Sequence, residues 1–267
     1  MRLLVHLSLI VVAHRDNFLN ACLLWIAGQH CTQMISFIVP AHNEEAWIAR
    51  CVSAIRNATE SVGEPYELIV VDDSSTDATA LVAEALGACV IHVEHRQISA
   101  TRNAGARRAS GDILFFVDGD TLVNTPVIQS ALRSTRGGAV GGGCVPRFEG
   151  SLPFWWRLFY PFMVGVIRLR RLPGGACQFC TRVAFEAAGG FSESHYAAED
   201  ALFVSALKRQ GRFVVLAEPV VTSGRSLRAH SCMSVMRLLM RFAFHGPDGF
   251  RDRQGLDLWY NPKREEG

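Results

Sequence analysis

The sequence lacks a run of about 18 consecutive apolar residues, which is the length that a helix needs to cross a bilayer. Two apolar pieces near the start, residues 3–13 and 18–27, are separated by the polar stretch from His14 to Asn17. An excess of one charge is also missing, because 27 Lys and Arg residues face 25 Asp and Glu, and the formal net charge is +2. These absences do not support a transmembrane protein, and they predict that nucleic acid is not a partner.

Cysteines are present but show no disulfide framework. The eight cysteines are scattered at positions 22, 31, 51, 89, 144, 177, 180 and 232, whereas disulfide-stabilised proteins are mostly short secreted chains. We therefore expect reduced thiols and a cytoplasmic protein, with association at the cytoplasmic face of a membrane as a second option. Cys177 and Cys180 are the only CxxC pair and lack further zinc ligands nearby, so we interpret them as small apolar strand residues.

Several common nucleotide-binding motifs are missing as well. No GxGxxG segment follows a predicted strand, which argues against NAD-type dinucleotide binding. The glycine-rich stretch from Gly137 to Gly143 has no following lysine of a P-loop, and we predict a flexible turn there before a strand through Cys144. The 267 residues contain no internal repeat or low-complexity linker, so one large α/β domain or two small ones fit the length.

What the sequence does contain, from Met34 onward, is an alternation of strand and helix patterns. Strands are predicted at residues 35–39, 68–71, 89–92 and 113–117. Of the three helices between them, the first begins near residue 43, the second runs through Leu86, and the third covers residues 98–109. Asn43 is the predicted cap of the first helix, which carries apolar residues at helical spacing. This alternation predicts an α/β fold with a mostly parallel sheet flanked by helices in a single domain.

The second half of the chain is less regular. Helices are predicted at residues 125–134, 154–169, 182–188, 197–210 and 233–244, a strand at 213–216, and a loose tail from Pro247. The helix at 154–169 is rich in aromatics and is followed by a small cluster of arginines at positions 168, 170 and 171. It could lie on a membrane surface with these arginines at the lipid head groups, or it could pack against the sheet.

The stretch from Gly111 to Asp120 (GDILFFVDGD) is the one on which the interpretation of the remaining motifs depends. Its five apolar residues predict a strand buried on both faces, and Asp118 and Asp120 follow directly. Open α/β sheets bind ligands at this carboxyl edge, and two adjacent carboxylates repel each other unless a cation or a shared proton compensates them. Since Asp72-Asp73 also ends a strand and Glu199-Asp200 begins a helix, the pattern predicts a metal and diphosphate site.

Five segments carry a family resemblance, in the same order along the chain. They are PAHNEE at Pro40 to Glu45, VDDSSTD at Val71 to Asp77, RNAGARRASGD leading into FFVDGDT, GGFSES at Gly189 to Ser194, and AAED at Ala197 to Asp200. Together they cover roughly Met34 to Arg225, and the chain resembles the family 2 glycosyltransferases of Rossmann-like GT-A fold. The resemblance implies an inverting enzyme that moves a sugar from a nucleotide-diphosphate sugar to a hydroxyl acceptor.

The resemblance also implies residue roles. Pro40, Ala41, Asn43 and Glu44 would line the pocket for the base and ribose of the donor, and Asp73 would hydrogen-bond the base, with a UDP-sugar favoured. Asp118 and Asp120 would be the DxD pair that holds Mn2+ or Mg2+ and the diphosphate, and Asp118 would thereby also contact the donor. Asp200 would be the general base that takes the proton of the acceptor hydroxyl.

Other implied roles rest on fewer matching residues. Arg96 or Arg102 would contact the diphosphate, with a surface arginine as the other interpretation. Residues 222–225, followed by His230, resemble a segment that closes over the diphosphate or metal in some relatives, so His230 is a candidate metal ligand or a structural histidine. The aromatic acceptor motif QxxRW is absent, which argues against processive polymer synthesis.

The sequence suggests three parts: an N-terminal extension (1–33), a glycosyltransferase domain (34–225), and a C-terminal helix with a loose tail (226–267). The first part is interpreted as an over-extended reading frame with the start at Met34, or as a weak membrane-associated leader. The acceptor is expected to be a sugar, a lipid-linked or another hydroxyl compound, in polysaccharide or cell-envelope synthesis, with peripheral membrane contact as an option.

Two alternatives to the transferase stay open at this point. One is a catalytically silent nucleotide-sugar-binding or membrane-recruiting protein, which the intact acidic motifs argue against. The other is a nucleotidyltransferase of related fold. Such enzymes usually carry a glycine-rich loop with lysine or arginine directly after the first strand, where this chain has PAHNEE.

Overall fold

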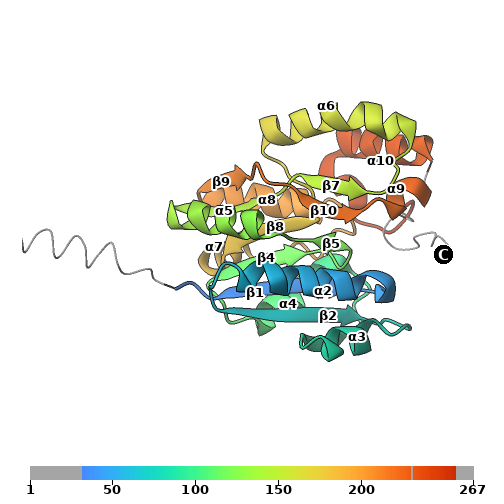
Figure 1. The fold of residues 1–267 in the computed structure, drawn as a ribbon. Helices are drawn as coiled ribbons and strands as arrows, with labels where there is room; N and C mark the ends of the chain where they lie inside the picture. The colour runs from blue at the N-terminus through green and yellow to red at the C-terminus, as the bar shows by residue number, and fades with distance from the viewer. Residues whose placement is uncertain (1–31, 230, 257–267) are drawn as a thin grey trace, which may run out of the picture. The chain divides into compact units, whose positions relative to one another are not determined.

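The computed structural model describes residues 32–229 and 231–256. The interpretations of residues 1–31, of His230 and of residues 257–267 lie outside this described part. Within it, a seven-stranded sheet has the order β3-β2-β1-β4-β8-β6-β9, and a three-stranded sheet has the order β5-β10-β7. Figure 1 labels these elements along the chain.

The first half folds as the predicted alternation of strands and helices. Its elements are β1 (Ile35–Ala41), α2 (Glu45–Glu60), β2 (Tyr66–Asp73), α3 (Thr79–Ala85), β3 (Cys89–Val93), α4 (Ile98–Arg108) and β4 (Ile113–Val117). β1 pairs in parallel with both β2 and β4, and β2 pairs in parallel with β3. The carboxyl ends of these strands therefore share one edge of the sheet.

The second half adds the remaining strands and helices. They are β5 (Thr121–Leu122), α5 (Thr125–Arg136), β6 (Ala139–Gly143), β7 (Pro146–Glu149), α6 (Phe154–Arg170), β8 (Cys177–Thr181), α7 (Arg182–Ala188), α8 (Glu199–Gln210), β9 (Arg212–Val215), β10 (Val220–Ser223), α9 (Arg225–Ala229), α10 (Cys232–His245) and a 3-10 turn (Gly246–Phe250). β8 runs antiparallel to both β4 and β6. The prediction of an α/β fold with a mostly parallel sheet is confirmed, with β8 as its antiparallel member.

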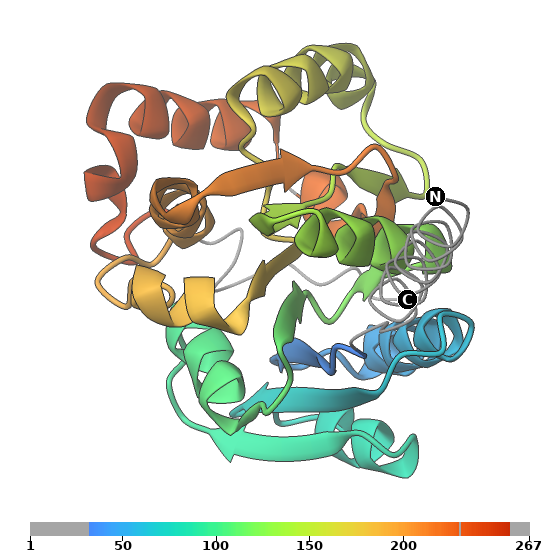
Figure 2. The same ribbon diagram turned by 90° about the vertical axis from the view of Figure 1, so that its left-hand side faces the viewer.

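Helices cover both faces of the large sheet (Figures 1 and 2). Phe115 and Phe116, which are neighbours on β4, point to opposite faces because successive strand residues alternate. Phe115 packs between Phe37 and Phe179 in the core that α2, α3 and α5 cover. Phe116 packs among aromatic rings on the other face, including Phe203 of α8. The prediction that this strand is buried on both faces is confirmed, since all five of its residues are buried.

Two local predictions were wrong near glycine and asparagine. Gly137 to Gly143 was expected to be a flexible turn, but its second part forms the interior strand β6. A Cβ at Gly142 would lie 2.5 Å from the Phe179 ring, so this glycine makes room for the ring. Asn43 is not the helix cap: Glu44 holds that position, and Asn43 sits before it with a φ of 55°.

The segment from Pro247 was expected to be a loose tail, and the structure describes it as far as Leu256. Within that part, Phe250 and Leu256 are buried beside Ala197, at the start of the segment that leads into α8. Their apolar side chains leave water there, which favours a packed arrangement. No helix in the described part is both long and apolar enough to cross a membrane.

Candidate active site

The site lies at the carboxyl edge of β1, β2 and β4, where three loops meet. The loops after β1 and β2 bind each other: the Asn43 side chain accepts a hydrogen bond from the backbone N–H of Thr76 at 2.7 Å, and the Asn43 N–H donates to Ser75 Oγ at 2.9 Å. The N–H of Glu44 donates to Thr79 Oγ1 at 2.7 Å. Pro40 and Ala41 are buried strand residues at the end of β1. The rim is therefore a fixed surface built from chain segments over 30 residues apart.

Asp73, at the end of β2, accepts hydrogen bonds through both carboxylate oxygens. One oxygen accepts the backbone N–H groups of His95 at 2.9 Å and Arg96 at 2.8 Å. The other accepts from the N–H of Gln97 and from the Thr101 hydroxyl at 2.7 Å. Asp73 thus holds the loop that leads into α4. Its contact with a base stays a prediction.

Asp118 and Asp120 flank the turn that joins the two sheets. Asp118 follows β4, and Asp120 precedes β5, whose Thr121 pairs with Thr222 of β10. The Thr222 hydroxyl also donates to Asp120 at 3.3 Å. Gly119 between them lies against the first loop, because a Cβ there would be 3.3 Å from the Glu44 side chain. The small residue lets the two loops approach closely.

Arg102 crosses the protein interior beneath these acids. Its side chain is only 2% exposed, and it donates to Asp118 at 2.8 Å and to Glu199 of α8 at 2.9 Å. The same guanidinium reaches the carbonyl of Gly175 and lies over the Phe191 ring at 5.2 Å. The alternative of a surface arginine is therefore wrong for Arg102. Arg96, by contrast, contacts His42 at the rim.

Glu199 and Asp200 occupy the first turn of α8, where the helix dipole favours negative charge. Burial raises the pKa of Glu199 from 4.5 to about 7; Asp200 adds to the increase, and Arg102 opposes it. Burial also raises the pKa of Asp200 above its usual 3.8, with Arg102 again opposing. One Asp200 oxygen accepts the N–H of Ala201 at 2.7 Å, and the other lies on the side of Gly175, 3.6 Å from where a Cβ of that glycine would be.

Glu44, Asp120 and Arg225 form a second charged group on the other side of the DxD turn. Arg225, at the start of α9, binds Glu44 and lies 3.4 Å from Asp120. Burial raises the pKa of Glu44 to about 7 despite Arg225, and the charges of Asp120 and Asp118 contribute. Burial likewise raises the pKa of Asp120 to about 6. The second carboxylate oxygen of Glu44 is buried and has no protein partner.

This donor set fits a hard divalent cation. Carboxylate oxygens suit Mg2+ or Mn2+, which are commonly bound by one or two carboxylates with substrate phosphates and water supplying the rest. Among the described residues, no cluster of three or more His, Cys, Asp or Glu side chains forms a ready cage. Burial is the main cause of the raised pKa values of Glu44 and Asp120, neighbouring carboxylates add to it, and one buried Glu44 oxygen has no protein partner. A cation bound there would favour the ionised form of these carboxylates.

The structure brings together most of the residues singled out from the sequence. Asp118 is bound to Arg102, Arg102 leads to the Glu199-Asp200 pair, and Glu44 reaches Asp120 through Arg225. Asp73 and Asn43 instead organise the rim loops. The sequence analysis missed the loop at Gly175; the Gly174-Gly175 pair before β8 was the available signal.

Comparison with known proteins agrees with this arrangement. Residues 36–188, more than half of the chain, match the family described as glycosyl transferase family 2. The chain belongs to this family of glycosyltransferases. The resemblance inferred from the motifs is confirmed.

Individual relatives are similar over shorter stretches. The undecaprenyl-phosphate 4-deoxy-4-formamido-L-arabinose transferase of Serratia proteamaculans is 35% identical over 100 residues, which are 34% of this chain and 30% of that protein. Such matches span only about a third of the length of the curated relatives.

Two solved structures share the fold. The mannosyltransferase PcManGT of Pyrobaculum calidifontis, in complex with GDP-Man and Mn2+, has a TM-score of 0.60 at 20% identity, covering 78% of this chain and 61% of that one. TarS of S. aureus in complex with UDP has a TM-score of 0.54 at 20% identity, covering 78% and 63%. They confirm a GT-A type of α/β architecture.

Proposed function

We propose that this chain transfers a sugar from a nucleoside-diphosphate sugar to a hydroxyl acceptor, with inversion at the anomeric carbon. One observation carries the proposal: Glu44, Asp118 and Asp120 crowd one edge of the sheet with incomplete neutralisation by Arg102 and Arg225. A site of this charge is suited to a cation and the diphosphate that accompanies it. The family membership makes a nucleotide sugar the natural donor class.

The donor's nucleoside is proposed to bind on the rim formed by residues 40–44 and Asp73. The loops there are fixed by hydrogen bonds before any ligand arrives, so little ordering cost accompanies binding. Two of the structural neighbours are complexes with UDP and with GDP-Man. A panel of UDP-, GDP- and TDP-sugars would therefore identify the base of the donor nucleotide.

Asp118 and Asp120 are proposed to hold Mn2+ or Mg2+ and, through it, the diphosphate. A cation bound there would neutralise the charge that develops on the departing diphosphate. Arg102 holds Asp118 in position from below, since its guanidinium is nearly immobile between Asp118 and Glu199. Arg225 holds Asp120 and Glu44 from the other side.

Asp200 is proposed to act as the general base. Its Oδ1 is held by the N–H of Ala201, and Oδ2 would take the proton of the acceptor hydroxyl as that oxygen attacks the anomeric carbon. Burial raises the pKa of Asp200, which makes the carboxylate a better proton acceptor. A single displacement of this kind inverts the anomeric configuration.

The activity test uses the purified full chain with each nucleotide sugar, Mn2+ or Mg2+, and measures release of nucleoside diphosphate. Asp200→Asn is expected to lower turnover about 10²–10⁴-fold, because proton removal by a positioned base contributes about that much. Asp120→Ala should abolish turnover, whereas Glu84→Gln, at an exposed position of α3, should leave it unchanged. Near-normal turnover of Asp200→Asn at saturating donor would refute the assigned base. Donor binding without release for the unaltered protein would instead indicate a silent binding protein.

The metal test needs no substrate. Mn2+ at about 100 times its dissociation constant should stabilise the folded protein by about 2.7 kcal/mol, measured as a rise in melting temperature. At the same Mn2+ concentration, the rise in melting temperature should be larger at pH 7.5 than at pH 5, because Glu44 and Asp120 are mostly deprotonated at pH 7.5. Asp120→Asn should remove most of it. A rise of equal size in Asp120→Asn would place the cation elsewhere.

A further inference from the structure

The most unusual surface of the described part is the outer side of α6. Helices of water-soluble proteins normally turn polar side chains to solvent. Here the solvent side carries Phe154, Leu158, Phe162, Val166 and Leu169, which are between 41% and 82% exposed. Their spacing of three or four residues puts them on one face. This stripe has no partner within the described chain that removes it from water.

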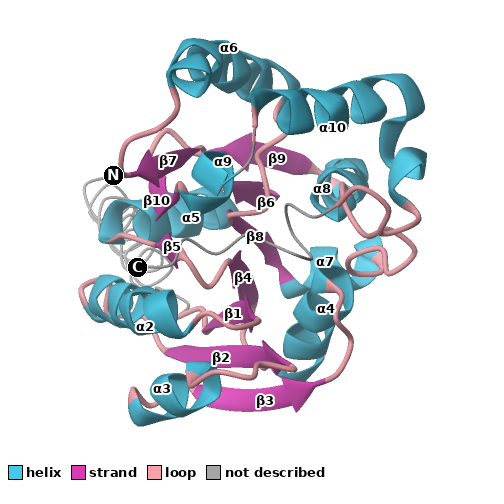
Figure 3. Cartoon of the chain, turned by 90° about the vertical axis from the view of Figure 1, so that its right-hand side faces the viewer, coloured by secondary structure: helices cyan, strands magenta, loops and turns pink. Residues whose placement is uncertain are grey.

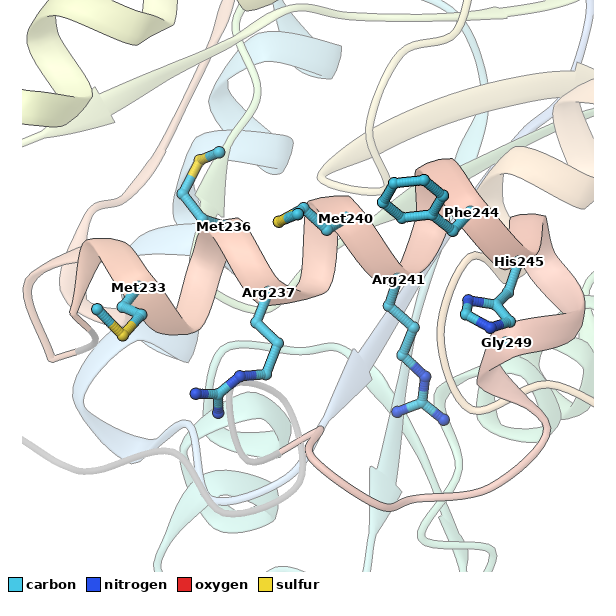
Figure 4. A pocket seen from close by; sticks show the side chains of 8 residues that line it. All are labelled: Met233, Met236, Arg237, Met240, Arg241, Phe244, His245 and Gly249. Atoms are coloured by element: carbon cyan, nitrogen blue, oxygen red, sulfur yellow. The ribbon is translucent and has the colours of Figure 1, made fainter.

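A second stripe lies on α10. Figure 4 shows Met236, Met240 and Phe244 on one side of this helix and Arg237 and Arg241 on another. The three apolar side chains are between 40% and 78% exposed. They border a hollow of about 730 Å³ on the surface. Methionine and phenylalanine are well suited to an adaptable apolar contact.

The two helices belong to one surface. Figures 1 and 3 draw α6 and α10 next to each other. Their inner sides share a small core, in which Trp156 of α6 packs with Leu227 and Val235 of α9 and α10 over Phe148 of β7. This shared core holds the two helices side by side, and each of them leaves an apolar stripe in water. We call these stripes, with their flanking arginines, the outer helix face.

The charged residues of the two segments that hold α6 and α10 are all basic, and Arg241 of α10 is paired with Asp252 at 3.1 Å. No Asp or Glu occurs between Glu149 and Glu186, or between Glu218 and Asp248. The first of these segments has exposed arginines at 157, 168, 170 and 171 around α6, and the second has Arg237 on α10. Arginine stems can lie along an apolar surface while the guanidinium stays at a polar boundary. The arrangement is complementary to a surface that is apolar inside and negatively charged at its border.

We propose that the outer helix face docks on the surface of a bilayer that contains anionic phospholipids. An interfacial helix with Phe, Leu, Met and Trp residues and basic flanks is attracted by apolar burial and by lipid charge together. A second copy of this chain is a poorer occupant, because a symmetric pair would bring the same arginines against each other. The proposal does not depend on the transfer reaction.

Docking would be coupled to the site by short connections. α6 is followed by the loop whose Gly175 carbonyl accepts from Arg102. α10 follows α9, whose first residue Arg225 contacts Glu44 and Asp120. Both membrane-contacting helices thus adjoin, in the chain, segments that hold the acidic site. A lipid-linked acceptor would be concentrated at this side of the protein.

The test is co-sedimentation of the full chain with vesicles of phosphatidylcholine alone and of phosphatidylcholine mixed equally with phosphatidylglycerol. We expect binding to the mixed vesicles and little to the neutral ones. Leu158→Ser with Phe162→Ser should weaken binding at least roughly tenfold, because two apolar side chains no longer leave water. The matched control, Leu81→Ser with Val183→Ser, changes residues that are 70% and 76% exposed elsewhere and should not weaken it.

A second pair of variants tests the charges without altering apolar surface. Arg168→Gln with Arg170→Gln should lower binding to mixed vesicles roughly fivefold per arginine, whereas Arg209→Gln on α8 should have little effect. Equal binding to both vesicle types, or loss in the control pair as large as in the test pair, would overturn the proposal. So would an unaltered protein that stays in the supernatant and elutes as a dimer that Leu158→Ser with Phe162→Ser makes monomeric.

Discussion

The two halves of this protein use their apolar residues in opposite ways. In the half from β1 to β4, all seven residues of β1 and all five of β4 are buried. In the half from β5 onward, α6 buries only Trp156 fully and leaves most of its other apolar residues at least partly in water. The first half buries its strands, partly against Phe179 of the second half, and holds a rim of fixed polar groups. The second half also buries strands such as β8, but its helices α6 and α10 leave apolar stripes in water. For this reason the first is called the closed half and the second the open half.

This difference indicates which part of the protein relies on fixed geometry and which part relies on surface chemistry. The proposed donor side would need a rigid arrangement of carboxylates and loops, because positioning of charge lowers the barrier of such a reaction. The outer side needs only a surface of suitable chemistry. Arg102 and Arg225 connect the halves, since each binds an acid of the opposite half.

Arg102→Met should give the largest effect. It leaves the buried Glu199 and the partly exposed Asp118 without their cation, and breaking a buried pair such as Arg102–Glu199 costs about 3–5 kcal/mol. Urea denaturation of the variant at pH 7.5 measures this loss. Adding Glu199→Met should restore part of the stability, because a neutral pair replaces the charged one. Arg209→Met on the exposed side of α8 is the control, and an equal loss there would refute the role of the buried pairs.

Glu44→Gln should change how stability depends on pH, by up to about 3 kcal/mol. The pKa of Glu44 is raised from 4.5 to about 7 in the folded protein. Its stabilising contribution is therefore fully present below pH 4.5 and is lost as the pH rises through 7. The variant lacks this loss, so it should gain stability relative to the unaltered protein between these pH values. Denaturation without divalent cations, at pH 4.5 and 8, measures the difference in the free energy of unfolding between the variant and the unaltered protein. The same difference at both pH values would show that folding does not raise the pKa of Glu44.

The sequence predicted the closed half well because its signals are local. β1 and β4 are apolar runs, and such runs predict strands buried on both faces. The first strand was expected to stop at Pro40, but β1 continues through Ala41. Asp73 is the last residue of β2 and Asp118 directly follows β4, so their common edge followed from parallel pairing alone. These were inferences from a few neighbouring residues at a time.

The open half and the connections between acids depend on distant residues. β5, β7 and β10 have two to four residues each, too few for a periodic pattern. The pair Arg102–Glu199 joins residues 97 apart, and Arg225–Glu44 joins residues 181 apart. No local pattern marks such partners, so Arg102 could be interpreted as a surface residue. A strand through Cys144 was predicted, but its glycine residues were assigned to a turn, because the need for glycine there comes from the ring of Phe179 on the neighbouring strand.

Gly175→Ala should have a smaller effect on stability and a clear one on turnover. A Cβ there would lie 3.0 Å from an Arg102 nitrogen, so the guanidinium must shift slightly, at about 1 kcal/mol. Because Arg102 positions Asp118, initial rates of diphosphate release should fall, up to about 10²-fold for a displacement near 1 Å. Gly174→Ala is the matched control, since no atom lies within 4 Å of its Cβ. Equal rates of diphosphate release in both variants would show that the loop at Gly175 does not affect the site.

The smallest effect is expected on the outer helix face. Leu158→Ser and Phe162→Ser each remove a side chain that is 75% or 67% exposed, and such substitutions usually change the free energy of unfolding by no more than about 0.5 kcal/mol. Trp156→Ala on the inner side of the same helix should cost about 3–5 kcal/mol, because Trp156 is 4% exposed and fills the shared core. Urea denaturation of the three variants measures both values. A large loss in the outer variants would mean that the stripe is needed for the fold itself, and the contrast between the halves would then disappear. A small loss leaves the stripe available for a partner, because residues that the fold does not use to exclude water are open to contact with another surface.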